Sequence, residues 1–182
     1  MPPFGCVLNF TSKKQGLKLD PAFASSRFPE ISFRRIPSRG VLTLYVLGHA
    51  APNELKDGNR LVSEQTLADA IMRRRRTPPT LIVWDVCYSK SFRTIGDRPF
   101  QHWGKNFVHI FSSQAYERTW LGTGTGKPVS FFSTQLVDAL KAGQRPSTWS
   151  DLEKRLRARF GNLQTPEIVS YNRSTPAQFA LP

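Results

Sequence analysis

Acidic residues and cysteines are both scarce in this chain of 182 residues. The 13 aspartates and glutamates are outnumbered by 26 lysines and arginines, which gives a formal net charge of +13. No Asp-x-Asp-x-Asp run occurs, so the sequence gives no support for a calcium site. The two cysteines, Cys6 and Cys87, are too few for a disulfide framework, and the histidines show no zinc-ligand spacing with them. We therefore expect free thiols, no metal and no other cofactor.

Long apolar runs and linkers are missing as well. No stretch approaches the ~20 apolar residues that a membrane-spanning helix requires. The first ten residues lack the basic start and apolar run of a signal peptide. These absences predict an intracellular, cytoplasmic protein. Without internal repeats or low-complexity segments, the length fits one domain over residues 1–182.

The excess of positive charge raises the odds of an acidic partner, nucleic acid above all. The basic residues are nevertheless spread along the chain, and the one dense run, residues 73–76, is typical of an exposed helix end. No nucleic-acid-binding motif is present. A basic α/β protein that binds nucleic acid therefore stays open as a less favoured alternative.

Strands alternate with helices in the expected secondary structure. Residues 41–47 and 80–86 are almost continuously apolar, which is typical of strands buried on both faces of a parallel sheet. Between them, a helix with Ser63 as its N-cap ends before the prolines at 78–79, so the three elements form a βαβ unit. Further strands are expected at 5–10, 31–36, 107–111 and 167–171, and further helices at 130–142 and 148–160. The pattern predicts an α/β three-layer sandwich with a mostly parallel central sheet, preceded by a largely irregular segment over residues 1–40.

His49 and Cys87 each follow one of the two buried strands. In open α/β sheets, functional groups gather beyond the carboxyl ends of the strands. An imidazole beside a thiol can take its proton and later protonate a leaving amine. The backbone N–H groups of Ala50 and Cys87 are placed to form an oxyanion hole. The alternative is that Cys87 is an inert buried thiol and His49 a structural histidine.

These motifs resemble the caspase and metacaspase family of cysteine peptidases. Gly48-His49-Ala50 stands where the family has Ser-Gly-His-Gly, and residues 85–89 match its Asp-x-Cys-x-Ser pattern. Residues 111–117, 130–140 and 164–166 resemble later family motifs in the same order, so the resemblance spans residues 41–171. It implies a caspase-like fold and a cysteine endopeptidase with His49 and Cys87 as the catalytic dyad.

Two positions depart from the family pattern. Ala50 and Lys90 each replace a glycine that the family usually has. These departures keep a second alternative open, a non-catalytic caspase-like domain that acts by binding a partner protein.

Substrate specificity is predicted from Asp85. It lies two residues before Cys87 in a strand, so both side chains project to one side. In metacaspases the matching aspartate lines the pocket that takes arginine or lysine, so the resemblance implies protein or peptide substrates cleaved after basic residues. Ser112 and Ser113, at the end of strand 107–111, either line the same pocket or only end the strand. The glycine-rich residues 122–127 do not fit a phosphate-binding loop, and we expect a mobile loop over the cleft.

Overall fold

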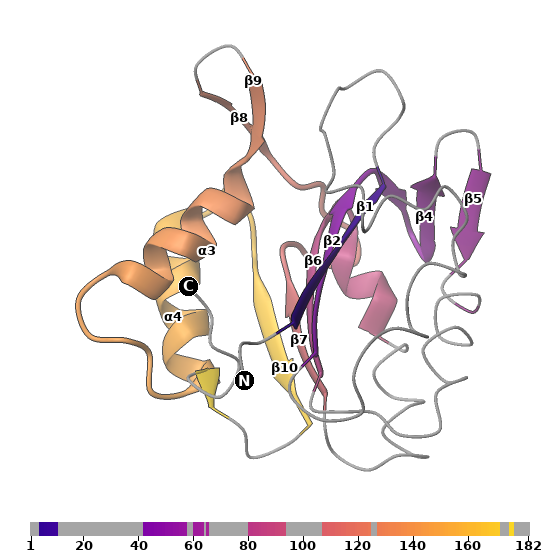
Figure 1. Ribbon diagram of the computed structural model, residues 1–182. Helices are drawn as coiled ribbons and strands as arrows, with labels where there is room; N and C mark the ends of the chain where they lie inside the picture. The colour runs from indigo at the N-terminus through magenta and orange to yellow at the C-terminus, as the bar shows by residue number, and fades with distance from the viewer. Residues whose placement is uncertain are drawn as a thin grey trace.

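A five-stranded sheet organises the protein, seen here in a computed structural model that describes residues 4–10, 42–57, 60–63, 65, 80–93, 107–124, 127–171 and 175–176. The strands of this sheet, in spatial order, are β1 (Phe4–Phe10), β2 (Leu42–Gly48), β6 (Thr80–Val86), β7 (Phe107–Phe111) and β10 (Glu167–Ser170) (Figure 1). The first four run parallel, and β10 pairs antiparallel with β7. The mostly parallel α/β sheet predicted from the sequence is confirmed.

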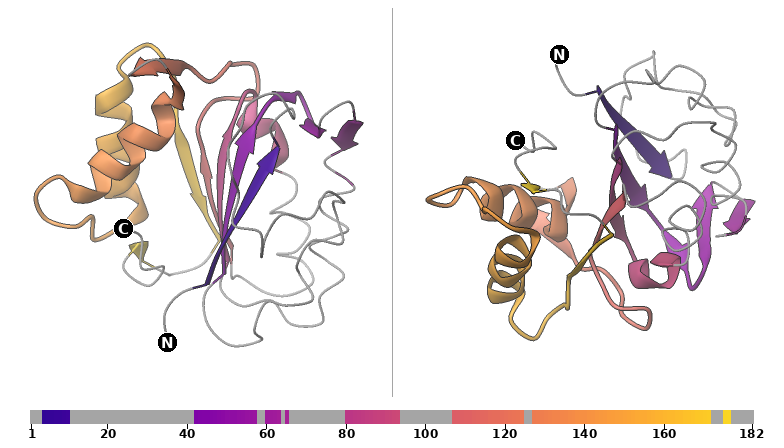
Figure 2. Two further views of the ribbon diagram at one scale, coloured as in Figure 1. Left: turned by 45° about the horizontal axis from the view of Figure 1, so that its top comes forward. Right: turned by 90° about the horizontal axis from the view of Figure 1, so that it is seen from below.

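Helices lie on both faces of this sheet. The helices α3 (Phe131–Lys141) and α4 (Trp149–Phe160) lie together on one face, and the 3-10 helix η1 (Ser89–Arg93) lies on the other (Figures 1 and 2). The three layers of the predicted sandwich are therefore present.

Local capping explains where α3 and α4 begin. The Ser130 side chain accepts a hydrogen bond from the Ser133 N–H, which satisfies a free donor in the first turn of α3. Thr148 and Asp151 form a capping box at the start of α4, in which each side chain accepts from the other residue's N–H. Gly161 ends α4 with a φ of 55°, a conformation that favours glycine. Both helices agree with the sequence prediction to within about one residue.

The core between the sheet and α3 and α4 is apolar. Alternate residues of β6 and β7 meet the inward faces of the two helices, as the period of two in strands and of 3.6 in helices requires. Its buried members are Leu81, Val83, Val108, Ile110, Phe132, Leu136, Ala139, Leu140, Trp149, Leu152, Leu156 and Phe160. This cluster covers the face of the sheet towards which Asp85 also points.

The opposite face of the sheet is covered by aromatic rings. Trp84 stacks between Phe92 of η1 and His109 of β7, with ring centroids 5.0 and 6.2 Å away. The Trp84 indole donates to His109 Nδ1 at 2.9 Å, and His109 Nε2 has no hydrogen-bond partner among the described residues. Complete burial, aided by the charge of Arg93, lowers the pKa of His109 to about 3. The imidazole is therefore neutral and structural.

Two smaller sheets are present that the sequence pattern does not predict. After His49, the strands β3 (Ala50–Ala51), β4 (Glu54–Asp57) and β5 (Arg60–Ser63) form an antiparallel sheet. The strands β8 (Leu121–Gly124) and β9 (Lys127–Ser130) pair antiparallel and overlap residues 122–127, where we expected a mobile loop. Strands of two to four residues are too short for a recognisable period, which explains the error.

Other expectations fall partly outside the described residues. Ser63, the predicted N-cap, is the last residue of β5, and Gln65 is helical. The rest of the helix predicted after Ser63 lies outside the described part, as does the strand predicted at 31–36. The predicted strand at 5–10 is present as β1 and forms an edge of the main sheet. Within the described segments, no helix is long and apolar enough to cross a membrane.

We predict that His109 makes the stability of the protein depend on pH. Its pKa falls from 6.5 to about 3 on folding, so its contribution is complete above pH 6.5 and is lost as the pH falls towards 3. Over that range the free energy of unfolding should fall with a slope approaching ~1.4 kcal/mol per pH unit from this group. Urea unfolding at several pH values measures this slope.

The control variant is His109→Asn, which can still accept from the Trp84 indole but does not titrate. Its slope should be smaller than that of the wild type between about pH 6 and pH 4. Identical slopes would show that His109 is not buried neutral.

Candidate active site

The pairing of β2 with β6 brings His49 and Cys87 to the same edge of the sheet. Gly48 is the register partner of Val86, and each is the last residue of its strand. Neighbouring strands lie ~4.8 Å apart, so the residues that follow begin at adjacent positions. His49 is exposed and Cys87 is half-buried. The two residues therefore begin at neighbouring positions of one sheet edge.

The backbone turns sharply at both positions. Gly48, directly before His49, has a φ of 154°, which favours glycine. Tyr88, directly after Cys87, has a φ of 56°, the left-handed region that costs a non-glycine residue about 1–2 kcal/mol. The Tyr88 N–H donates to the Glu117 carbonyl at 2.7 Å, which helps to hold this conformation. Strain of this kind clusters at functional sites.

The carbonyl of Val86, one residue before Cys87, is held by hydroxyl groups. It accepts hydrogen bonds from Ser112 at 3.1 Å, from Ser113 at 3.4 Å and from Thr119 at 2.7 Å. Ser112 and Ser113 are completely buried. The structure thus places both serines behind the Cys87 turn, and their predicted contact with substrate stays a prediction.

Ser89 anchors the chain on the other side of Cys87. Its hydroxyl donates to the Ser113 carbonyl at 2.9 Å and accepts from the Ser113 N–H at 2.8 Å. The Ser89 N–H donates to the Ser113 hydroxyl at 3.1 Å. The turn that carries Cys87 is therefore fixed to the end of β7 on both sides.

One hydrogen bond joins the loops that carry His49 and Cys87. The Asn53 N–H, in the turn between β3 and β4, donates to the Ser91 hydroxyl of η1 at 2.8 Å. Ala50, the expected oxyanion donor, is the first residue of β3 and is half-buried. The bond restrains the segment after His49 relative to the segment after Cys87.

Asp85 is buried beneath this edge and faces α3. Its carboxylate oxygen Oδ2 accepts hydrogen bonds from the Tyr45 hydroxyl at 3.0 Å and from the Ser133 hydroxyl. Its other oxygen, Oδ1, has no hydrogen-bond partner among the described residues. The Ser130 hydroxyl lies close to the carboxyl group but makes no bond of normal geometry with Oδ1. Half of the hydrogen-bonding capacity of the carboxylate is therefore unused.

Burial dominates the electrostatics around Asp85. It raises the pKa of the Asp85 carboxyl, and the nearby hydroxyl groups of Ser130, Ser133 and Tyr45 oppose this rise in part. Burial and the neighbouring carboxylate likewise raise the pKa of the Tyr45 hydroxyl, which stays protonated as a donor. No basic side chain makes an ion pair with Asp85 among the described residues.

Arg118 is a neighbour of Cys87 that the sequence did not reveal. Its Nε donates to the Tyr88 hydroxyl at 3.2 Å, and this contact raises the pKa of Arg118. The guanidinium is fully exposed. No local sequence pattern indicates this contact, because Arg118 follows Tyr88 by 30 residues.

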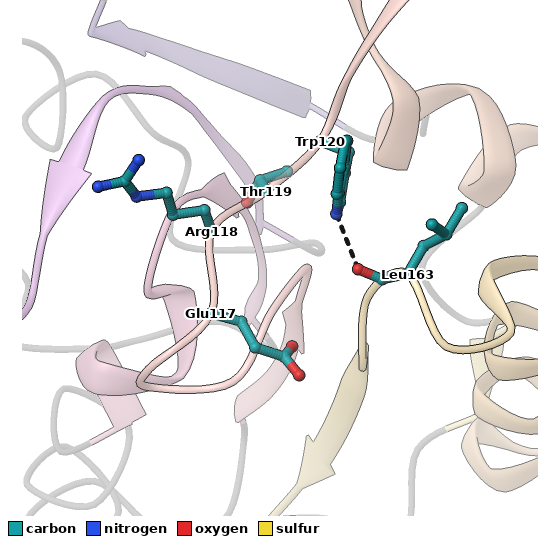
Figure 3. Close-up of a pocket in the computed structure, with 5 residues that line it drawn as sticks. All are labelled: Glu117, Arg118, Thr119, Trp120 and Leu163. Carbon is teal, nitrogen blue, oxygen red and sulfur yellow. Dashed lines mark hydrogen bonds between the residues drawn. The ribbon is translucent and has the colours of Figure 1, made fainter.

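A pocket of about 470 Å³ adjoins this segment, lined by Glu117, Arg118, Thr119, Trp120 and Leu163 (Figure 3). The Trp120 indole donates to the Leu163 carbonyl at 2.8 Å, and both side chains are 56% exposed. In Figure 3 the Arg118 guanidinium points away from these two side chains. The pocket therefore has an exposed apolar wall beside the Cys87 turn.

Metal-ligand clusters are not found in the described part of the chain, where no three His, Cys, Asp or Glu side chains come together to hold an ion. The groups at the strand ends are instead a thiol, an imidazole and a separate carboxylate. Such a set suits proton transfer and nucleophilic attack.

The mostly parallel sheet, flanked by helices and with functional groups at its carboxyl edge, has the caspase-like α/β fold. No protein-family model matches the chain, and no curated protein matches its sequence. Among solved structures it is similar to the crystal structure of caspase-1 from Spodoptera frugiperda, with a TM-score of 0.51 and 17% sequence identity. The match covers 75% of this chain and 63% of that chain, so this chain spans less than two thirds of the caspase. The likeness establishes the fold, and the activity has to be argued from the site.

We predict that the buried Ser89 hydroxyl is a main support of the Cys87 turn. Ser89→Ala leaves the buried Ser113 N–H without its partner and removes one of the two donors to the Ser113 carbonyl, which keeps the Lys90 N–H, so the free energy of unfolding should fall by about 1–3 kcal/mol. Chemical denaturation measures the loss. Ser150→Ala, at an exposed position of α4, should change stability by less than ~0.5 kcal/mol and serves as the control. Equal effects at the two positions would contradict the role of Ser89.

Proposed function

We propose that this protein is a cysteine endopeptidase of the caspase and metacaspase type, with Cys87 as nucleophile and His49 as its proton-transfer partner. The observation that carries the proposal is the Gly48–Val86 register, which starts both functional residues from adjacent strand ends. The caspase-like fold and the strained turn at Tyr88 support it.

The reaction follows from the residue chemistry. His49 removes the proton from the Cys87 thiol, and the thiolate attacks the carbonyl carbon of the scissile peptide bond. The N–H groups of Ala50 and Cys87 stabilise the oxyanion of the tetrahedral intermediate. The C–N bond then breaks, and protonated His49 gives its proton to the leaving amine. Water attacks the resulting thioester, with His49 as general base, and regenerates the thiol.

Asp85 supports a preference for arginine or lysine before the scissile bond, as in metacaspases. A buried carboxylate without a cation is costly, and its free Oδ1 suits a guanidinium or ammonium donor. A substrate cation beside the carboxyl group would also oppose the effect of burial and lower the pKa of Asp85. An acidic substrate side chain would be left buried and unpaired at this position. Protein or peptide substrates with basic residues therefore fit the site best.

The first test removes the dyad. Cys87→Ala should reduce cleavage of basic peptides at least ~1,000-fold without unfolding the protein, because no other group supplies the nucleophile. His49→Ala should lose ~100-fold or more, because proton transfer then depends on water. Peptide hydrolysis and thermal unfolding, measured on the same preparations, separate lost chemistry from lost structure.

Two outcomes would contradict this assignment. Cleavage at the wild-type rate by Cys87→Ala would exclude Cys87 as nucleophile. If the wild type cleaves no peptide and Cys87 reacts with a thiol probe no faster than a free cysteine, a non-catalytic interaction domain is the better description. Salt-dependent retention on nucleic acid would instead favour the nucleic-acid alternative.

The second test concerns specificity. Asp85→Asn keeps an acceptor for Tyr45 and Ser133 but removes the charge, so kcat/KM on arginine peptides should fall ~100-fold or more. Stability should be retained or increased, because a buried charge without a cation is removed. A citrulline peptide, which keeps the shape of arginine without its charge, is the matched control and should respond little. A substrate library with a preference for aspartate at this position would refute the specificity.

A further inference from the structure

Lys90 forms a partly buried ion pair close to Cys87. Its ammonium group donates to Glu167 Oε2 at 2.5 Å and to Gln114 Oε1 at 2.9 Å. The side chains of Lys90 and Glu167 are 25% and 19% exposed. Gln114 is also buried and donates through Nε2 to the same Glu167 oxygen at 3.3 Å. A pair so shielded from water is coupled more strongly than an ordinary surface pair.

The ion pair joins segments that are far apart in the chain. Lys90 belongs to η1, which begins two residues after Cys87, whereas Glu167 is the first residue of β10. Gln114 follows the end of β7, which lies between β6 and β10 in the sheet. The three side chains therefore connect the segment after the nucleophile to the end of one strand and the start of the next.

The charges around Glu167 indicate that its contact with Lys90 is ionic. Burial alone would raise the pKa of Glu167, but hydrogen bonds from Lys90 and Gln114, with the charges of Lys90 and Arg93, give a net lowering. Glu167 is thus held as a carboxylate beside the Lys90 ammonium group. The Lys90 N–H also donates to the Ser113 carbonyl at 3.1 Å, so backbone and side chain are fixed together.

We propose that Lys90 is a positioning residue, which sets the orientation of the Cys87 turn through its ion pair with Glu167. The proposal rests on the proposed function of Cys87 as the nucleophile. The direction of the turn decides where the Cys87 thiol and N–H point relative to His49 and to the oxyanion. Small errors in such geometry reduce the rate of the chemical step more than the binding of substrate.

The test compares Lys90→Met, which removes the charge, with Lys90→Arg, which keeps it. In Lys90→Met, kcat should fall about tenfold while KM changes less than about twofold, because the reacting groups are displaced but the pocket is not. Lys90→Arg should recover most of the rate. Glu167→Gln, which is nearly isosteric, should reproduce the loss from the other side of the pair.

A second measurement does not depend on proteolysis. The rate of Cys87 alkylation by iodoacetamide near neutral pH, followed by peptide mass spectrometry to separate it from Cys6, should fall about threefold or more in Lys90→Met. Arg157→Met breaks a 2.8 Å ion pair with Glu153 on the surface of α4 and is the matched control. It should leave alkylation and kcat unchanged.

The outcomes separate this proposal from the proposed function. Unchanged alkylation in both Lys90→Met and Glu167→Gln would overturn the positioning role, even if the protein is an active protease. Equal losses in Arg157→Met would overturn it too, by showing a general effect on stability. If the wild type cleaves no peptide, the protease proposal fails, while slower Cys87 alkylation in both variants would still support the positioning of the turn by Lys90.

Discussion

The parallel, in-register pairing of β2 with β6 is the contact on which the candidate site depends. Because Gly48 stands opposite Val86, the next residue of each strand, His49 and Cys87, begins at the same level of the sheet. A shift of one residue would turn the side chains of β6 to the opposite face and place Asp85 on the side of the aromatic rings. The apolar sequence of both strands, together with the well-packed cluster beneath α3 and α4, holds this register. In the proposed mechanism, the reacting groups thus lie just beyond the strands, and the strand register sets their relative position.

Much of this architecture could be predicted from local sequence. The strands at 80–86 and 107–111 are apolar runs with clear ends. The N-cap residues Ser130 and Thr148 predict where α3 and α4 begin. The antiparallel direction of β10 could not be predicted, because composition carries no information on strand direction. The sheet of β3, β4 and β5 was missed because its strands of two and four residues leave no period to detect.

The candidate site, too, could be predicted only in part from the sequence. Asp85 and Cys87 are two positions apart at the end of β6, so the strand period alone predicts that they share a side, although Cys87 lies one residue beyond the strand. The contacts of Lys90 with Glu167 and of Tyr45 with Ser133 join residues that are 77 and 88 positions apart. No local pattern encodes such pairs, which exist only after the sheet and α3 have assembled. The sequence could therefore nominate the reacting groups, whereas the side chains that orient them required the structure.

Lys90 and Asp85, two buried or partly buried ionisable residues near Cys87, differ in whether they have a partner of opposite charge. Lys90 has its partner Glu167 within the protein, whereas Asp85 is surrounded by hydroxyl groups and has no cation among the described residues. The chain carries 26 basic residues against 13 acidic ones. A basic partner for Asp85 was therefore easier to supply than an acidic partner for Lys90. The net charge of the chain, +13, should repel basic substrates at long range, but salt screens that repulsion beyond ~8 Å. In the proposed specificity, direct contact of a basic side chain with the Asp85 carboxylate outweighs this repulsion, because a buried charge gains most from a partner that replaces its lost water. The proposed preference for arginine or lysine therefore depends on contact at Asp85 and not on the overall charge of the chain.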